Sequence, residues 1–592
     1  MKKTEKISVL ISIVLISLIA IGAVSAADDT AATDDADLAA VDEVQTVDSN
    51  QIDDDVSYES EDIVVTSTGD SGDDDVAAAD NAKGSALGAN DLTAGEKTFT
   101  ELNNDIGSAQ NGIVMLQNDY KYDSSDSAYQ NGIDLAGTLT IIGGGHTIDG
   151  NNAARIFNIA QGANIVFVNL KLTNAANSAI YNEGTAILSG TDITNSAAEK
   201  GGAIYNTATG TIDASDCEFT DNTAVYRGGA IYSEGTVSVS DCKFDKNDVT
   251  YREKNLDNGG AAIYNLGGTI TADGCTFTNN LKNYVIRGTN DQAGDLINGI
   301  ITSYGSTTIT DSIFDSNSAC YGGAITIGNR ADEKATVSIT GSTFANNIAY
   351  TGAAIYISGN TDYTIDNCEF DNNQAIGYGS KGYTAAGGAI QVLSCTGEGT
   401  ISNSDFTNNK VYNTVTPLGG AIATENSGDL TVDTCNFEGN DVTSGEAYSQ
   451  GGAIYNSGTD LNVIGSTFTN NKATDGGAIY NYLDTDASVS TSTFTGNEAD
   501  WGPAISNDGT LSLTGNTVYG DDAAILNYFG TLESTIKVTI LDGLAHTVSV
   551  PTYDLTATVT DDNGNKIYDP NFVFKVGEDE VAATFDAADS IY

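Results

Sequence analysis

The chain has 592 residues, and its 81 Asp and Glu against 24 Lys and Arg give a formal net charge of −57. This charge argues against nucleic acids and anionic membrane surfaces as partners, because both are negatively charged themselves. The seven cysteines form no Cys-x-x-Cys pair and His146 has no second histidine nearby, so we expect neither a metal nor another cofactor.

The N-terminus carries a targeting segment. Three lysines precede an apolar run over residues 7–24, and Val24-Ser25-Ala26 then offers small residues for cleavage. We therefore predict a signal peptide at residues 1–26 and an exported, extracellular protein at the cell surface or envelope. The apolar run reaches the ~18 residues that can span a bilayer, so an uncleaved anchor stays open.

An acidic tract follows at residues 27–95. Between Asp28 and Asp80 it holds nineteen acidic residues and no Lys or Arg, so it repels itself and cannot collect an apolar core. We predict a disordered linker. A calcium-collecting arm is the alternative, but the acids lack the spacing of a preformed calcium loop.

Residues 96–175 are expected to form an N-terminal cap and opening coils. Phe99, Leu102 and Ile106 lie at helical spacing, which predicts a helix that covers the end of a stack of strands. The segment GIVMLQNDYKY then indicates a first strand, and the residues that follow, up to Asn174, indicate irregular coils.

Residues 176–530 repeat one pattern: Gly-Gly-Ala-Ile, a turn, an alternating apolar run, and small-x-Phe-x-x-Asn. Clear copies are Gly201–Asn222, Gly228–Asn247, Gly322–Asn347, Gly387–Asn409, Gly419–Asn440, Gly451–Asn471 and Gly476–Asn497. Each copy reads as about three short strands with one apolar side and with Gly or Asn at the corners. Such a period predicts an all-β solenoid.

One copy cannot fold alone. Burying its four apolar side chains contributes about 6–12 kcal/mol, whereas ordering its backbone costs about 1–2 kcal/mol for each of some 20 residues. Stacked copies share their core, so we predict thirteen coils, each anchored by an isoleucine from Ile180 to Ile525. The Phe and Asn residues of Phe-x-x-Asn should then form two columns, with the asparagines bonded along the stack.

The combination of Gly-Gly-Ala-Ile with Phe-x-x-Asn resembles the repeat of chlamydial polymorphic membrane proteins, and that of adhesin-like surface proteins of methanogenic archaea. The resemblance covers about Thr98 to Asn527 and rests on ten Phe-x-x-Asn copies. It implies a right-handed parallel β-helix of the pectin-lyase type that serves as a surface adhesin.

Five cysteines stand two residues before the repeat phenylalanine, where other copies carry serine. They are Cys217, Cys242, Cys275, Cys368 and Cys435. This interchange predicts a small inward-facing site, where a free thiol behaves as a small apolar group. Stacked neighbours also have poor disulfide geometry, so thiols are favoured over disulfides.

The insertions between Phe-x-x-Asn and the next Gly-Gly should emerge on one side of the stack, which is often the binding face of a solenoid. They carry residue types that dominate recognition surfaces. The candidate ligand-binding residues are Tyr251, Arg252, Tyr284, Arg287, Tyr378, Tyr383, Tyr412 and Tyr448. The alternative is that these tyrosines fold back onto the outer wall of neighbouring coils.

Residues 534–592 change to longer alternating runs with a hairpin signal at Asn563-Gly564. They resemble the first strands of an immunoglobulin-like β-sandwich, and their number predicts only part of such a domain, so we expect the chain to be a fragment.

Export, a rigid rod and loops on one side favour a non-catalytic adhesin that binds glycans or proteins of another cell. Attachment to a membrane or wall would then need a terminal anchor. A polysaccharide lyase or polygalacturonase is the alternative on the same fold, because Gly520-Asp521-Asp522 is similar to the acidic segment of polygalacturonases. The supporting polygalacturonase residues are missing, so no catalytic residue is expected. An autotransporter passenger and a structural envelope protein also stay open.

Overall fold

The computed structural model describes residues 95–250, 258–281, 297–328, 334–377, 385–412, 416–442, 448–519, 524–528, 530–534, 539–541, 573–576 and 579–582. The predicted signal peptide, nearly all of the acidic tract, the Gly520–Asp522 segment and most of residues 534–592 lie outside these ranges.

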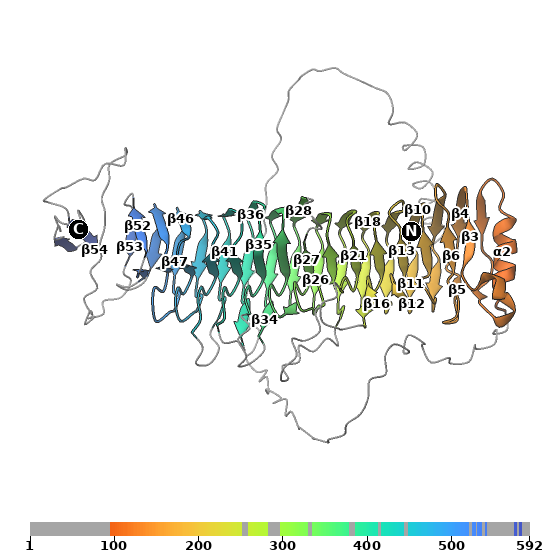
Figure 1. Ribbon diagram of the computed structural model, residues 1–592, viewed down its shortest axis with the longest axis horizontal. Coiled ribbons are helices and arrows are strands. Elements are labelled where there is room, and N and C mark those ends of the chain that lie inside the picture. Colours follow the sequence, from red (N-terminus) through yellow and green to blue (C-terminus); the bar gives the residue numbers. More distant parts are fainter. Residues whose placement is uncertain are drawn as a thin grey trace, which may run out of the picture. The chain divides into compact units, whose positions relative to one another are not determined.

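A short helix covers one end of the stack (Figure 1). Helix α2 spans Phe99–Gly107 and begins with a capping box between Thr98 and Glu101, which satisfies backbone N–H groups of its first turn. Phe99, Leu102 and Ile106 are buried, as their spacing predicted. The carboxylate of Asp126, in the 3-10 helix η1 (Ser124–Tyr129), accepts hydrogen bonds from the N–H groups of Phe99 and Thr100.

The described chain then winds through three parallel sheets, one strand of each sheet per rung. The first sheet holds β1 (Ile113–Met115), β4 (Thr138–Ile142), β7 (Asn164–Val168), β10 (Thr185–Ser189), β14 (Thr211–Ser215), β18 (Thr236–Ser240), β22 (Thr269–Asp273), β25 (Ser306–Thr310), β28 (Ala335–Thr340), β32 (Thr361–Asp366), β36 (Gly399–Ser402), β40 (Leu430–Asp433), β43 (Leu461–Ile464), β46 (Asp486–Ser490), β49 (Thr510–Thr514) and β52 (Thr531–Ser534).

The second sheet carries the repeat phenylalanines. It holds β2 (Tyr120–Lys121), β5 (Thr147–Asp149), β8 (Lys171–Thr173), β11 (Asp192–Thr194), β15 (Glu218–Thr220), β19 (Lys243–Asp245), β23 (Thr276–Thr278), β26 (Ile313–Asp315), β29 (Thr343–Ala345), β33 (Glu369–Asp371), β37 (Asp405–Thr407), β41 (Asn436–Glu438), β44 (Thr467–Thr469), β47 (Thr493–Thr495), β50 (Thr517–Tyr519) and β53 (Thr539–Leu541).

The third sheet carries the isoleucine anchors. It holds β3 (Ile133–Leu135), β6 (Phe157–Ile159), β9 (Ile180–Asn182), β13 (Ile204–Asn206), β17 (Ile231–Ser233), β21 (Ile263–Asn265), β24 (Ile301–Ser303), β27 (Ile325–Ile327), β31 (Ile355–Gly359), β35 (Ile390–Cys395), β39 (Ile422–Glu425), β42 (Ile454–Ser457), β45 (Ile479–Asn481), β48 (Ile505–Asn507) and β51 (Ile525–Asn527). The prediction of stacked coils is therefore confirmed, and the architecture is a parallel β-helix.

Some rungs add a fourth short strand after Phe-x-x-Asn, which the three-strand prediction missed. These strands form two small sheets, β12 (Ala197–Lys200), β16 (Thr223–Arg227) and β20 (Asp248–Val249), and β30 (Ile348–Ala349), β34 (Gln374–Ile376) and β38 (Lys410–Tyr412). Beyond the β-helix, β54 (Val573–Val576) pairs antiparallel with β55 (Asp579–Ala582).

The opening coils are regular, which corrects the expectation of irregular ones. Ile133 pairs with Phe157, and Phe157 pairs with Ile180, so two further rungs precede the first predicted anchor. These rungs lack the Gly-Gly corner that marks the repeat. They keep the inward apolar residues, and those residues suffice to extend the core.

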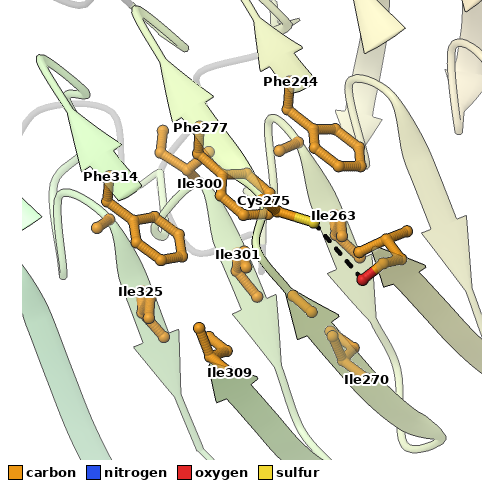
Figure 2. Packing of buried hydrophobic residues seen from close by; sticks show 14 of the residues in the cluster. Phe244, Ile263, Ile270, Cys275, Phe277, Ile300, Ile301, Ile309, Phe314 and Ile325 are labelled. Carbon is orange, nitrogen blue, oxygen red and sulfur yellow. Dashed lines mark hydrogen bonds between the residues drawn. The ribbon is translucent and has the colours of Figure 1, made fainter. Parts of the chain in front are cut away.

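The interior is built from columns of identical residues. Successive phenylalanine rings from Phe219 to Phe494 are stacked with centroids 4.6–4.9 Å apart and planes within 2–8° of parallel. Figure 2 shows Phe244, Phe277 and Phe314 of this column beside the isoleucines of the third sheet. The predicted phenylalanine column is confirmed.

The predicted asparagine ladder is confirmed as well. Asn373 is typical: its Nδ2 donates to Asn409 Oδ1 at 2.9 Å and to the Phe344 carbonyl at 2.9 Å. Its Oδ1 accepts from the backbone N–H and the Nδ2 of Asn347. Every rung from Asn222 to Asn497 repeats the side-chain bond, at 2.9–3.1 Å.

All seven cysteines are buried free thiols, as expected. The serines that replace cysteine in other rungs show why this inward position takes a small side chain. Ser404 Oγ accepts from the Cys368 N–H, and Ser466 Oγ accepts from the Cys435 N–H, each at 3.1 Å. The site therefore holds a small side chain that faces the backbone of the neighbouring rung.

Candidate functional site

The predicted insertions leave the stack at one corner, between the second and third sheets. The residues beside them pair across rungs, because Asn258 bridges to Ile297, Ala386 to Leu418, and Leu418 to Gln450. The corner is therefore continuous along the β-helix, and it adjoins the outer face of the third sheet.

Six of the eight candidate ligand-binding residues lie outside the described residues. They are Tyr251, Arg252, Tyr284, Arg287, Tyr378 and Tyr383. Tyr412 folds back onto the wall, where its hydroxyl donates to Gln374 Oε1 at 3.1 Å. Tyr448 is 43% exposed, and its hydroxyl donates to Asp475 Oδ2. The two described tyrosines thus behave differently.

The outer face of the third sheet carries aromatic and charged side chains that the predicted loop face did not include. In each rung the anchor isoleucine points inward and the next residue points outward, as in β13, where Ile204 and Asn206 are buried and Tyr205 is partly exposed. A second outward position lies four residues before the anchor, at the Gly-Gly corner, where Lys200, Arg227, Asp475 and Trp501 are found.

We call the N-terminal part of this face the cation–tyrosine segment; its members are Arg155, Tyr181, Lys200, Tyr205, Arg227, Tyr232, Glu234 and Tyr264. The rings form a row, with centroids of neighbouring tyrosines 4.9–5.7 Å apart. A cation from one rung covers the tyrosine of the next: Arg155 over Tyr181 at 5.0 Å, Lys200 over Tyr232 and Arg227 over Tyr264, both at 5.1 Å.

Burial governs the titration of this segment. It lowers the pKa of Arg155 and raises the pKa of Tyr205 to about 12. The hydroxyls of Tyr205 and Tyr232 both donate to Glu234 Oε1, at 3.3 and 2.9 Å, so the carboxylate also holds these phenols protonated. The three cations and the Tyr205 and Tyr232 hydroxyls therefore have partners within the segment.

We call the C-terminal part of the face the acid–aromatic segment; its members are Tyr448, Tyr455, Asp475, Tyr480, Tyr482, Trp501 and Asp508. The Tyr448 and Trp501 rings are tilted, with centroids 6.0 Å apart. Tyr455 and Tyr480 are stacked at 5.8 Å, and the Tyr480 hydroxyl donates to Asp508 Oδ2 at 2.5 Å.

Asp475 is the unusual member of this segment. Its side chain stands at the corner position that Lys200 and Arg227 hold in earlier rungs, and the residue is only 7% exposed. Its Oδ1 is buried without a hydrogen-bond partner. Burial raises the pKa of Asp475, and the side chains of Ser506 and Tyr448 partly offset that rise.

A shallow groove of about 400 Å³ lies elsewhere, on the outside of the first sheet. Three aspartates from successive rungs, Asp429, Asp460 and Asp486, line it together with Thr431, Asn462 and Ser488. It offers hydrogen-bond acceptors and hydroxyls.

Within the described ranges, no group of histidine, cysteine and acidic side chains has the arrangement of a metal site. Likewise, none of the helices found there has the length and apolar character needed to cross a bilayer.

Comparison with known proteins supports the architecture. Residues 298–518 match the family described as right-handed β-helix region, which gives the parallel β-helix its hand. Residues 216–234 match the chlamydial polymorphic membrane protein repeat, in agreement with the resemblance of the sequence pattern. No curated protein and no solved structure matches the chain significantly. The archaeal part of the resemblance stays a prediction.

Proposed function

We propose that the chain is an exported, non-catalytic surface adhesin, which binds glycans or proteins of another cell through the corner loops and the adjoining outer face of the third sheet. The observation that carries the proposal is the continuity of this corner. Insertions of different length all leave at this corner, and the adjoining outer face carries aromatic and charged side chains in its N-terminal and C-terminal parts, whereas the interior of the rungs is nearly constant.

The match to a repeat of chlamydial membrane proteins supports exposure at a cell surface, and the predicted signal peptide supports export. Location is tested by treating intact producer cells with a protease and detecting the chain with an antibody. Loss of the chain from intact cells is the expected result. Protection until the cells are lysed would contradict surface exposure.

Binding is tested with the full chain on partner cells and on an array of glycans and proteins. The loop variant replaces Tyr251, Arg252, Tyr284 and Arg287 by alanine. We expect it to bind at least about tenfold more weakly, because aromatic and arginine residues dominate recognition energies.

The matched control variant replaces four outward residues of the second sheet by alanine. They lie in register on successive rungs: Ile313, Thr343, Glu369 and Asp405. Both variants should keep the circular dichroism of the parent chain. Equal binding by the two variants would refute the proposed face, and no binding by the parent chain would refute adhesion.

A second function, a polysaccharide-active enzyme, is favoured by one observation. Asp475 lies close enough to Asp508 for the charge of Asp508 to contribute to the rise in its pKa, and a pair of neighbouring carboxyl groups is what glycoside hydrolysis uses. Incubation with neutral and acidic polysaccharides, followed by assay of reducing ends and unsaturated products, tests it. Turnover that Asp475→Asn abolishes would replace the adhesin proposal.

A further inference from the structure

Exposed aromatic side chains gather at one end of the β-helix. Among the described residues, six of the nine exposed large apolar side chains fall between residues 448 and 528. Trp501 is 45% exposed, Tyr448 43% and Tyr482 39%. Because water-exposed rings of this size are costly, the three that belong to the acid–aromatic segment mark a surface that a partner could cover.

The two segments of the outer face use one geometry with opposite charges. In the cation–tyrosine segment, Lys200 and Arg227 reach from the corner of one rung over the tyrosine of the next. In the acid–aromatic segment, Asp475 and Trp501 hold the same corner positions on neighbouring rungs. The acid–aromatic segment therefore has aromatic rings and a carboxylate, but it lacks at its corner the cations that cover the rings of the cation–tyrosine segment.

The hydrogen bonds of Asp475 leave room for that cation. Oδ2 accepts from the Tyr448 hydroxyl, whereas Oδ1 is buried without a partner. An unsatisfied buried acceptor is unfavourable, and a guanidinium group can bond both oxygens of a carboxylate at once. Pairing of a guanidinium with both oxygens requires the Tyr448 side chain, which is 43% exposed, to move aside.

The acidic charge around Asp475 also favours a cationic partner. Asp508 lies in the same segment, and Lys472, three residues before Asp475, is paired with Glu498 at 3.0 Å. The chain as a whole has a formal net charge of −57, so long-range attraction steers cations toward it.

We propose that the acid–aromatic segment binds arginine side chains of a basic protein segment, with the guanidinium paired to Asp475 and packed against Trp501 and Tyr448. Trp is the best ring for such a contact, and Arg is better suited than Lys to pair with a carboxylate and stack on a ring. The inference rests on the proposed adhesive face and names the chemistry of one partner for it.

The test uses the full chain and the fluorescence of Trp501, which is the only tryptophan. An arginine-rich peptide, its lysine counterpart and a neutral serine-rich peptide of equal length are titrated at low salt. We expect the arginine peptide to change the Trp501 emission and to bind several-fold more tightly than the lysine peptide. Added salt should weaken the binding.

Two substitutions and two matched controls decide whether the site itself is responsible. Asp475→Asn, followed by calorimetry, should weaken the arginine peptide by about tenfold or more, because a charged bidentate pair is lost. Trp501→Ala should do likewise. Asp460→Asn removes the same charge from the first-sheet groove, and Tyr519→Ala removes an equally exposed ring from the second sheet; neither should change the affinity by more than about twofold.

The proposal is overturned if Trp501 does not respond to the arginine peptide, if Asp475→Asn and Asp460→Asn weaken binding equally, or if only neutral oligosaccharides change the emission. Cell binding is scored separately. Cells bound without any peptide response would remove this inference and leave adhesion standing. A Trp501 response without cell binding would support the arginine site and remove the adhesion proposal.

Discussion

The interior of the β-helix and the outer face of its third sheet are made by the same rungs in the same register, yet their side chains follow different rules. Inside, phenylalanine stacks on phenylalanine and asparagine bonds to asparagine across ten rungs. Outside, the corner position changes from Lys200 and Arg227 to Asp475 and Trp501. A ladder requires the same residue above and below, whereas an outward residue requires only solvent or a ligand. The residues that stabilise the stack and those of the proposed binding face therefore lie on opposite sides of the same strands.

The largest effect should come from the phenylalanine column. Phe344→Ala removes a fully buried ring that stacks on Phe314 and Phe370, so we expect a loss of about 3–5 kcal/mol in the free energy of unfolding. Tyr205→Ala, on the outer face, should cost clearly less. Urea denaturation followed by circular dichroism measures both. Equal losses would break the contrast between inside and outside.

The asparagine ladder should come next. Asn373→Ala removes the donor to the Phe344 carbonyl and to Asn409, and it leaves buried polar groups on both neighbouring rungs unsatisfied. We expect a loss of about 1–3 kcal/mol for each group left unpaired. Hydrogen exchange should show faster opening at the rungs on either side. A loss below about 0.5 kcal/mol would mean that water replaces the ladder without cost.

The buried thiols of the interior should make the stability of the β-helix depend on pH. Burial raises the pKa of Cys368 to about 11 and that of Cys435 to about 12. In the unfolded chain these thiols ionise near pH 8.5, so the folded state binds more protons above that pH. The stability that the thiols contribute is thus complete below about pH 8.5 and declines as pH rises toward their folded values.

Two measurements check this expectation. The free energy of unfolding should fall between pH 9 and pH 11, and a Cys368→Ser/Cys435→Ser variant should show a shallower fall. A thiol reagent at pH 8 should label none of the seven cysteines in the folded chain and all seven in denaturant. Rapid labelling of the folded chain would contradict the burial of this column.

The smallest effect is expected on the outer face. Arg227→Ala removes the cation 5.1 Å from the Tyr264 ring centroid and should lower the free energy of unfolding by about 0.5–2 kcal/mol. Arg227→Lys, which keeps a cation, should recover part of that loss. An effect as large as that of Phe344→Ala would show that the outer face also holds the rungs together.

The interior could be read from the sequence because its columns are periodic. Phe-x-x-Asn and the Cys–Ser interchange fix which residues lie above one another, and the structure confirms both columns. The prediction of irregular opening coils is wrong, because Ile133 and Phe157 continue the core without the Gly-Gly marker.

The outer face could not be read in the same way. The Ala-Ile-Tyr pattern of the repeats does place tyrosines after the anchors, and this signal was available. However, the contact of Arg227 with Tyr264 joins a corner of one rung to a strand of the next. That pairing depends on how far the corner side chain reaches toward the next rung, and no local sequence pattern predicts this distance. The pairing of Tyr448 with Asp475 is hidden for the same reason.

The matching of every rung to its neighbours also makes the length of the rod adjustable by whole turns. Excision of residues 451–475 would bring Ile422 beside Ile479, Phe437 beside Phe494 and Asn440 beside Asn497, and each of these meets a residue of its own kind. Gene duplication or loss within such a coding region can therefore lengthen or shorten the protein without disturbing what remains, and so change how far the proposed binding face would stand from the cell.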